Sequence, residues 1–112
     1  FSKGIYLNLV RCHAYFNKPI IITENGVPDA EDKIRPSFIK DHLAWVGRAI
    51  SEGIDIRGYF HWSLLDNFEW ESGFGSRFGL VEINRKTLER KPRPSSYVYS
   101  EIIKSNAVEI NN

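Results

Sequence analysis

Two segments of the chain repeat apolar residues at steps of four, three and four, the spacing of one helix face. The first apolar stripe is Ile5, Leu9, Cys12 and Phe16, and the second is Ile39, Leu43, Val46 and Ile50. The first predicted helix ends near Asn17. The second begins at Pro36 and ends at Gly53, because proline suits a first helical turn and glycine a helix end. Two amphipathic helices are therefore predicted.

Two other segments have the composition of strands. The segment "PIIITENG" has three isoleucines at positions 20–22 without polar alternation and ends at Asn25 and Gly26. A run of this kind predicts a strand that is buried on both faces in a parallel sheet. The segment "IDIRGYFHWSL", residues 54–64, is rich in Ile, Tyr, Phe and Trp and predicts a second strand.

The predicted elements alternate along the chain as they do in parallel α/β proteins. After the second strand come a long loop, a short strand in "GLVEI" and a last helix from Pro94 to about Ser105. Two parallel strands and three helices cannot bury both faces of a sheet, so we expect neighbouring strands to be missing. The chain starts at Phe1 and contains no methionine. We therefore expect residues 1–112 to be one partial domain of a longer protein.

The composition, with 112 residues, 42% hydrophobic, 26% charged and a net charge of +1, is that of a globular protein. A charge near zero gives no reason to expect nucleic acid or a membrane as partner, and no apolar run approaches the ~20 residues of a membrane span. The basic run "RKTLERKPR", residues 85–93, is interrupted and predicts a solvated turn. Because no His/Cys cluster occurs, we expect neither a metal nor a cofactor. The lone Cys12 is expected to be buried on its helix, and the location to be cytoplasmic.

Carboxylates and indole rings follow both predicted strands. Glu24 comes directly after the first strand, and Trp62, Glu69 and Trp70 lie in "HWSLLDNFEW", residues 61–70. Because the carboxyl ends of parallel strands meet at one rim, we expect these side chains to lie close together. An indole face packs against the C–H face of a sugar ring, and a carboxylate accepts hydrogen bonds from its hydroxyls. The set predicts a sugar site with Glu24 as nucleophile or general base.

Three segments, "PIIITENG", "DIRGYFHWSLLDNFEWESGFGSRFGLVEI" and "RKPRPSSYVY", together resemble the C-terminal part of a family 1 glycoside hydrolase. The similarity runs from about Gly4 to Asn106. The ending "RPSSYVY" resembles the archaeal branch of the family, because bacterial and plant members more often have a tryptophan at the position of Val98. The spacing is specific, since "HWSLLDNFEW" begins 37 residues beyond Glu24. The family consists of retaining β-glucosidases and β-galactosidases built on a (β/α)8 barrel. The resemblance therefore implies an α/β fold, a C-terminal portion of a TIM barrel with about its last two strand–helix units.

The resemblance also implies a role for each matching residue. Glu24 would be the catalytic nucleophile at the end of the seventh barrel strand, and Trp62, at the end of the eighth, would form a wall of the glycone subsite. Glu69 would accept hydrogen bonds from the 4- and 6-hydroxyls of the sugar, and Trp70 would donate its N–H to the 3-hydroxyl. Phe78 would lie at the edge of the same pocket.

Four other residues of the family pattern and the three histidines are expected to be structural. Asp66 and Asn67 would shape the loop after the second strand. Asp32 and Arg35 would pair across the loop before the second helix, which is worth only ~0–1 kcal/mol if the pair is exposed. The histidines, expected to be structural or solvated, are His13, His42 and His61.

The carboxylate of Glu69 would repel a phosphate, so the implied substrates are unphosphorylated β-glucosides, β-galactosides or oligosaccharides, with fucosides and mannosides left open. Retaining hydrolysis needs two carboxyl groups about 5–5.5 Å apart. The family's acid/base glutamate lies in a Thr-x-Asn-Glu-Pro segment, and no "NEP" occurs in this chain. We therefore expect the chain to carry the nucleophile half of a retaining β-glycosidase and to be inactive alone. Its expected partner is the remainder of the barrel, on the same polypeptide or another.

Two alternatives to a catalytic role remain open. One is a sugar-binding module without catalysis, in which Trp62, Glu69 and Trp70 form a lectin-like patch. The other is an inactive fragment that keeps the motif without a working pocket. The sequence also leaves a homo-oligomer open, as well as the preferred sugar and aglycone.

Overall fold

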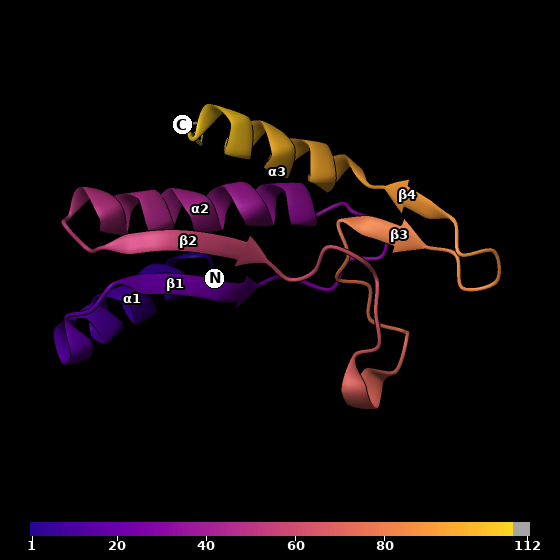
Figure 1. Cartoon of the computed structure of the whole chain (residues 1–112), viewed down its shortest axis with the longest axis horizontal. Helices are drawn as coiled ribbons and strands as arrows, with labels where there is room; N and C mark the ends of the chain where they lie inside the picture. Colours follow the sequence, from indigo (N-terminus) through magenta and orange to yellow (C-terminus); the bar gives the residue numbers. More distant parts are fainter. Residues whose placement is uncertain (109–112) are drawn as a thin grey trace.

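The chain forms alternating helices and strands in the predicted order (Figure 1). The computed structural model describes residues 1–108. The elements of the first half are α1 (Lys3–Phe16), β1 (Ile20–Asn25), α2 (Arg35–Ser51) and β2 (Ile56–His61). Those of the second half are the short 3-10 helix η1 (Trp70–Ser72), β3 (Val81–Ile83), β4 (Arg90–Pro92) and α3 (Pro94–Ser105). The three predicted helices are therefore confirmed.

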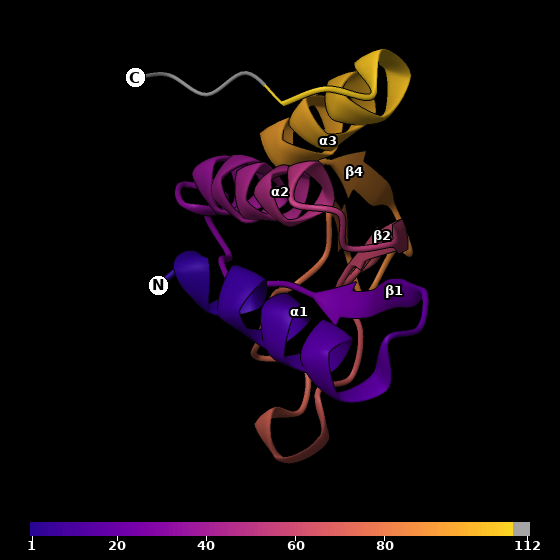
Figure 2. The same ribbon diagram turned by 90° about the vertical axis from the view of Figure 1, so that its left-hand side faces the viewer.

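Strands β1 and β2 pair in parallel, as the sequence predicts. Ile20 is aligned with Ile56 at one end of the pair, and Asn25 with His61 at the other. Helices α1 and α2 lie on the same side of this sheet, and α3 lies against α2 (Figure 2). The buried core lies between the sheet and the two helices and consists of Leu9, Val46, Ala49 and Ile54.

Within residues 1–108, no helix covers the other face of the sheet (Figure 2). Ile21 and Phe60 are 55% and 60% exposed there. The prediction of a first strand buried on both faces is therefore correct for one face only. Helix α1 also has an uncovered apolar surface, because Phe16 is exposed. Cys12, which was predicted to be buried, is exposed as well. Each of these apolar surfaces would need further secondary structure to exclude water.

The second half of the chain contains a hairpin that the sequence did not predict in full. The predicted strand in "GLVEI" forms as β3, and it pairs antiparallel with β4, with Val81 opposite Pro92. The basic run 85–93 is thus a turn followed by a short strand. Its last residue, Arg93, is buried, so the prediction that the whole run is solvated is wrong at this position.

Among residues 1–108, no helix is both long enough and apolar enough to cross a membrane. The same part of the chain contains no group of three or more His, Cys, Asp or Glu side chains that could hold a metal ion.

Candidate active site

The carboxyl ends of β1 and β2 lie side by side. The backbone N–H of Trp62, directly after β2, donates a hydrogen bond of 3.0 Å to the carbonyl of Asn25, the last residue of β1. Glu24 precedes Asn25 on β1, and its side chain is exposed. Parallel pairing therefore brings Glu24 and Trp62 to the same end of the sheet, as the sequence predicts.

Gly26 lets the two chain segments approach closely at this point. A Cβ atom built on Gly26 would lie 1.8 Å from the carbonyl oxygen of Trp62 and 2.8 Å from its carbonyl carbon. Both are backbone atoms, which cannot rotate away as a flexible side chain would. Only glycine at position 26 is compatible with this distance between the end of β1 and Trp62.

A hydrogen bond joins two of the predicted sugar-binding side chains directly. The indole N–H of Trp62 donates to Oε1 of Glu69 over 2.9 Å, and both residues are half-buried. The family resemblance implies a separate contact with the sugar for each of them, and this bond was not predicted from the sequence. The bond restricts the orientation of the carboxylate, whose second oxygen can still accept hydrogen bonds.

Backbone hydrogen bonds to Ser63, the residue after Trp62, bring Phe78 close to Trp62. The N–H of Ser63 donates to the carbonyl of Phe78 over 3.2 Å, and the N–H of Leu80 donates to the carbonyl of Ser63 over 2.9 Å. Phe78 is half-buried. Trp70, in contrast, lies in η1 on the loop that projects away from the sheet (Figure 1), and its side chain is 84% exposed. Trp70 thus directly follows Glu69, which is bonded to Trp62, but its own side chain is open to solvent.

Asp66 and Asn67 shape the loop that carries these side chains, as predicted. The side-chain amide of Asn67 donates to Oγ of Ser63 and to the carbonyl of Leu65, each over 3.1 Å. Asp66 is 3% exposed, and its carboxylate accepts two hydrogen bonds from Arg93, at 3.0 and 2.9 Å.

The pKa of Asp66 lies below its ordinary range. Burial alone would raise the pKa, but hydrogen bonds from Arg93, from the N–H of Gly79 and from Arg77, together with the charge of Arg93, outweigh that effect. The carboxylate is therefore charged in the folded chain and paired with a buried guanidinium. The role of Arg93 was not predicted, because nothing in a run of basic residues marks the one that is buried.

Protonation of His61 is expected to weaken the fold between about pH 6.5 and 4. The imidazole is buried at the end of β2, next to the ring of Tyr99, at a centroid distance of 6.2 Å. Burial, helped by the charge of Arg35, lowers the pKa of His61 from 6.5 to about 4. In this range the unfolded chain binds a proton that the folded chain does not. The contribution of neutral His61 to the free energy of unfolding is thus fully present above pH 6.5. It falls by about 3 kcal/mol towards pH 4, at about 1.4 kcal/mol per pKa unit.

Urea unfolding of the chain at several pH values from 7.5 to 4 measures this dependence. The same series on His61→Leu is the control, because leucine has a similar size and no proton to bind. The control should lose much less stability over this range. Equal pH dependence in both proteins would show that another group causes it.

Comparison with known proteins gives the family of the chain. The model of the family described as Glycosyl hydrolase family 1 matches residues 2–108. The chain belongs to this family. Among its family 1 relatives, a β-galactosidase of Pyrococcus woesei is 43% identical over 109 residues, which are 96% of this chain and 21% of the relative. β-Glucosidase A of Acetivibrio thermocellus is 41% identical over 116 residues, covering 95% of this chain and 26% of the relative.

Solved structures of family 1 enzymes have the same fold over this chain. The β-glycosidase of Pyrococcus horikoshii superposes with a TM-score of 0.93 at 49% identity, covering 98% of this chain and 26% of that one. The β-glucosidase of Thermotoga maritima in complex with glucoimidazole gives 0.93 at 37% identity, covering 96% and 27%. These structures are (β/α)8 barrels, so the predicted fold class, a portion of such a barrel, is confirmed. The chain spans about a fifth to a quarter of the length of the relatives it matches.

Proposed function

We propose that this chain carries the nucleophile half of a retaining β-glycosidase. The observation that carries the proposal is the shared sheet end, where the strand bearing Glu24 is hydrogen-bonded to Trp62, whose indole in turn holds Glu69. An exposed carboxylate on the same sheet end as an indole that is bonded to a second carboxylate is suited to a sugar ring whose anomeric carbon faces Glu24. Family membership supports this assignment, because the relatives are named β-galactosidases and β-glucosidases.

In the proposed reaction Glu24 attacks the anomeric carbon as the bond to the leaving oxygen breaks. A second carboxylic acid protonates that oxygen, and a covalent glycosyl-enzyme intermediate forms. Water, deprotonated by the same second group, then releases the sugar and regenerates the Glu24 carboxylate. The family's acid/base segment is not found in this sequence. We therefore propose that the second group comes from the remainder of the barrel and that residues 1–112 form one partial domain.

The proposed substrates are unphosphorylated β-glucosides and β-galactosides. Glu69, with Oε1 held by Trp62, would accept hydrogen bonds from sugar hydroxyls through its second oxygen. A carboxylate in this position would repel a phosphate on the same sugar. Phe78 would close the edge of the pocket. Trp70 would donate its N–H only if the projecting loop is held against the sugar by the rest of the barrel.

The proposal is tested by completing the barrel. The segment of the Pyrococcus woesei β-galactosidase that precedes the matched region is joined to this chain, and the product is called the joined protein below. We expect the joined protein to hydrolyse an aryl β-glucoside or aryl β-galactoside, and each part alone to show no turnover, because each has only one of the two carboxyl groups.

Two results would contradict the proposal. Turnover by the isolated chain that is lost in Glu24→Gln would show that no second half is needed. A folded joined protein that binds glucose or galactose without turnover would favour the sugar-binding alternative. In this second case, a titration with and without Trp62→Ala shows whether the indole forms the binding surface.

A further inference from the structure

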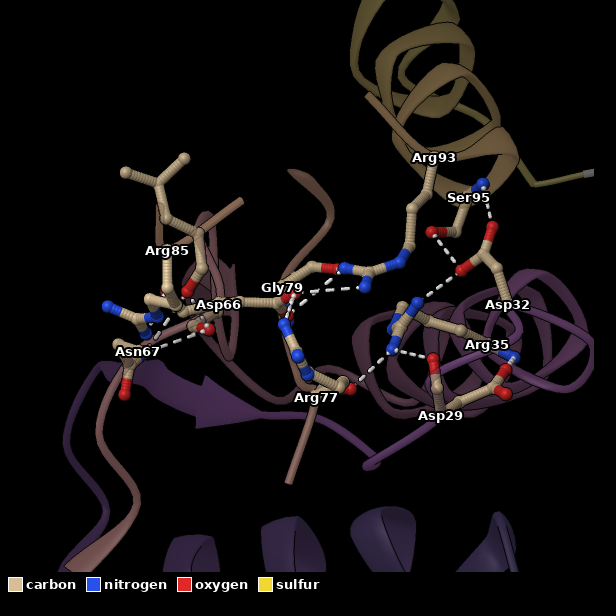
Figure 3. Close-up of polar contacts among 12 residues, drawn as sticks. Asp29, Asp32, Arg35, Asp66, Asn67, Arg77, Gly79, Arg85, Arg93 and Ser95 are labelled. Atoms are coloured by element: carbon tan, nitrogen blue, oxygen red, sulfur yellow. Dashed lines mark hydrogen bonds and ion pairs between the residues drawn. The ribbon is translucent and has the colours of Figure 1, made fainter. Parts of the chain in front are cut away.

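The segment that starts α3 is tied to the loop after β2 by a buried ion pair (Figure 3). Arg93 directly precedes α3, and its guanidinium donates to both carboxylate oxygens of Asp66 and, over 2.7 Å, to the carbonyl of Gly79. The side chains of Arg93 and Asp66 are only 6% and 1% exposed. This two-pronged geometry fixes both distance and orientation, because the guanidinium and the carboxylate are planar and rigid.

The same segment is tied to the loop after β1. Ser95, the second residue of α3, donates its backbone N–H over 2.7 Å and its hydroxyl over 2.6 Å to the carboxylate of Asp32. Asp32 also forms a buried ion pair with Arg35 of α2. The pair predicted from the sequence is thus confirmed, but it is buried and not exposed. A negative charge at the start of α3 is also favoured by the helix dipole.

Arg35 joins the two loops to each other. Its guanidinium donates to the carbonyl of Asp29 over 2.6 Å and to the carbonyl of Arg77 over 2.7 Å (Figure 3). The backbone N–H of Asp29 donates to the same Arg77 carbonyl over 2.9 Å. On the other side of Phe78, the N–H of Gly79 donates to Asp66 over 2.9 Å. The backbone is therefore held on both sides of Phe78, once by Arg35 and once by Asp66.

We propose that Arg93, Asp66, Arg35 and Asp32, here called the loop clamp, are positioning residues that fix the wall of the sugar site relative to the nucleophile. This inference rests on the proposed function. The loop clamp links the loop after Glu24 to the loop after Trp62 in two ways, directly through Arg35 and through the start of α3. Loss of one link lets the backbone around Phe78 and Ser63 move, and with it the indole that holds Glu69.

Physical chemistry favours positioning over stability as the reason for these buried charges. Burying an ion pair costs desolvation energy that its attraction barely offsets, and well-packed apolar residues often stabilise a fold as much or more. An apolar contact, however, has no fixed direction, whereas paired guanidinium and carboxylate groups define a single geometry. A site built on loops needs this precision, because a displacement of about 1 Å can cost about 10²-fold in rate.

Arg93→Lys is the variant that tests the loop clamp, because lysine keeps the charge but cannot form the two parallel bonds to Asp66. In the joined protein we expect kcat/KM per competent site to fall at least about tenfold. Competent sites are counted from the burst of aglycone released in the first turnover. A purely structural role would change the number of competent sites and leave kcat/KM per site unchanged.

Hydrogen exchange of the joined protein provides a second readout that does not depend on catalysis. Arg93→Lys should speed exchange in peptides from residues 62–80 several-fold and leave the centre of α2 unchanged. Arg48→Lys is the matched control, because Arg48 pairs with Glu52 on the exposed face of α2, outside the site. Neither its exchange nor its kcat/KM should change. If Arg93→Lys does not fold, Ser95→Ala, which removes only the hydroxyl bond to Asp32, should give smaller changes in the same direction.

The two readouts separate the loop clamp from the proposed function. Faster exchange in residues 62–80 together with lower kcat/KM per site supports the loop clamp. Unchanged exchange, or faster exchange with unchanged kcat/KM per site, would overturn it. A folded but inactive wild-type joined protein would instead contradict the proposed function. The exchange result would then decide alone whether the loop clamp holds the loop.

Discussion

Glutamine in place of Glu24 is expected to lower the activity of the joined protein by at least about 10⁴-fold, the scale seen when a catalytic nucleophile is removed. The amide has nearly the shape of the carboxylate but cannot form the glycosyl ester on which retaining hydrolysis depends. In the 112-residue chain, where the Glu24 side chain is exposed, the change should alter the free energy of unfolding by less than about 0.5 kcal/mol. Initial rates of the joined protein on an aryl β-glucoside measure the first effect, and urea unfolding of the 112-residue chain measures the second.

Glu101→Gln is the control for this loss. Glu101 is an exposed residue of α3 that pairs with Lys104, and the same change there removes a carboxylate without touching the site. Its activity should equal that of the wild type. An active Glu24→Gln protein, or equal losses in both variants, would mean that Glu24 is not the nucleophile.

Alanine in place of Gly26 is expected to destabilise the chain by about 3 kcal/mol or more, at the upper end of the usual cost of overpacking. The added Cβ would lie 1.8 Å from the carbonyl oxygen of Trp62, so one of the two backbone segments has to move. That movement separates the indole from Glu24. In the joined protein kcat/KM should therefore fall by about 10²-fold even in the fraction that folds.

Gly47→Ala is the matched control for Gly26→Ala. Gly47 is an exposed residue inside α2, and an added Cβ would meet no atom of residues 1–108 within 4 Å. Alanine favours helix over glycine, so this variant should be more stable than the wild type by about 0.5–1 kcal/mol and equally active. Thermal unfolding of both variants gives the sign of each effect. A Gly26→Ala chain as stable as the wild type would contradict the close approach of Trp62.

Much of the fold could be predicted because its signals are local. The apolar steps of α1 and α2 lie within each helix, and the isoleucines of β1 are consecutive. Parallel pairing then places the end of β1 beside the end of β2, so the common position of Glu24 and Trp62 follows from element order alone. The predicted burial of Cys12 and Ile21 is wrong, because burial depends on which other elements cover a residue.

The links within the candidate site could not be predicted from spacing. Arg93 lies 27 residues from Asp66, and Ser95 lies 63 residues from Asp32. Basic residues are frequent in residues 85–93, and the sequence does not distinguish the buried one from its solvated neighbours. The bond from Trp62 to Glu69 spans only seven residues, yet it depends on how the loop folds back on itself.

The sequence by itself determined the helices, the parallel strands and the carboxylate at the end of β1, because periodicity and composition act over a few neighbouring residues. The tertiary structure alone decided which charges are buried, which indole holds Glu69 and how α3 ties the two loops together. These contacts join residues far apart in the chain, and a pairing between distant charged groups becomes favourable only after the fold has removed both from water and fixed their orientation.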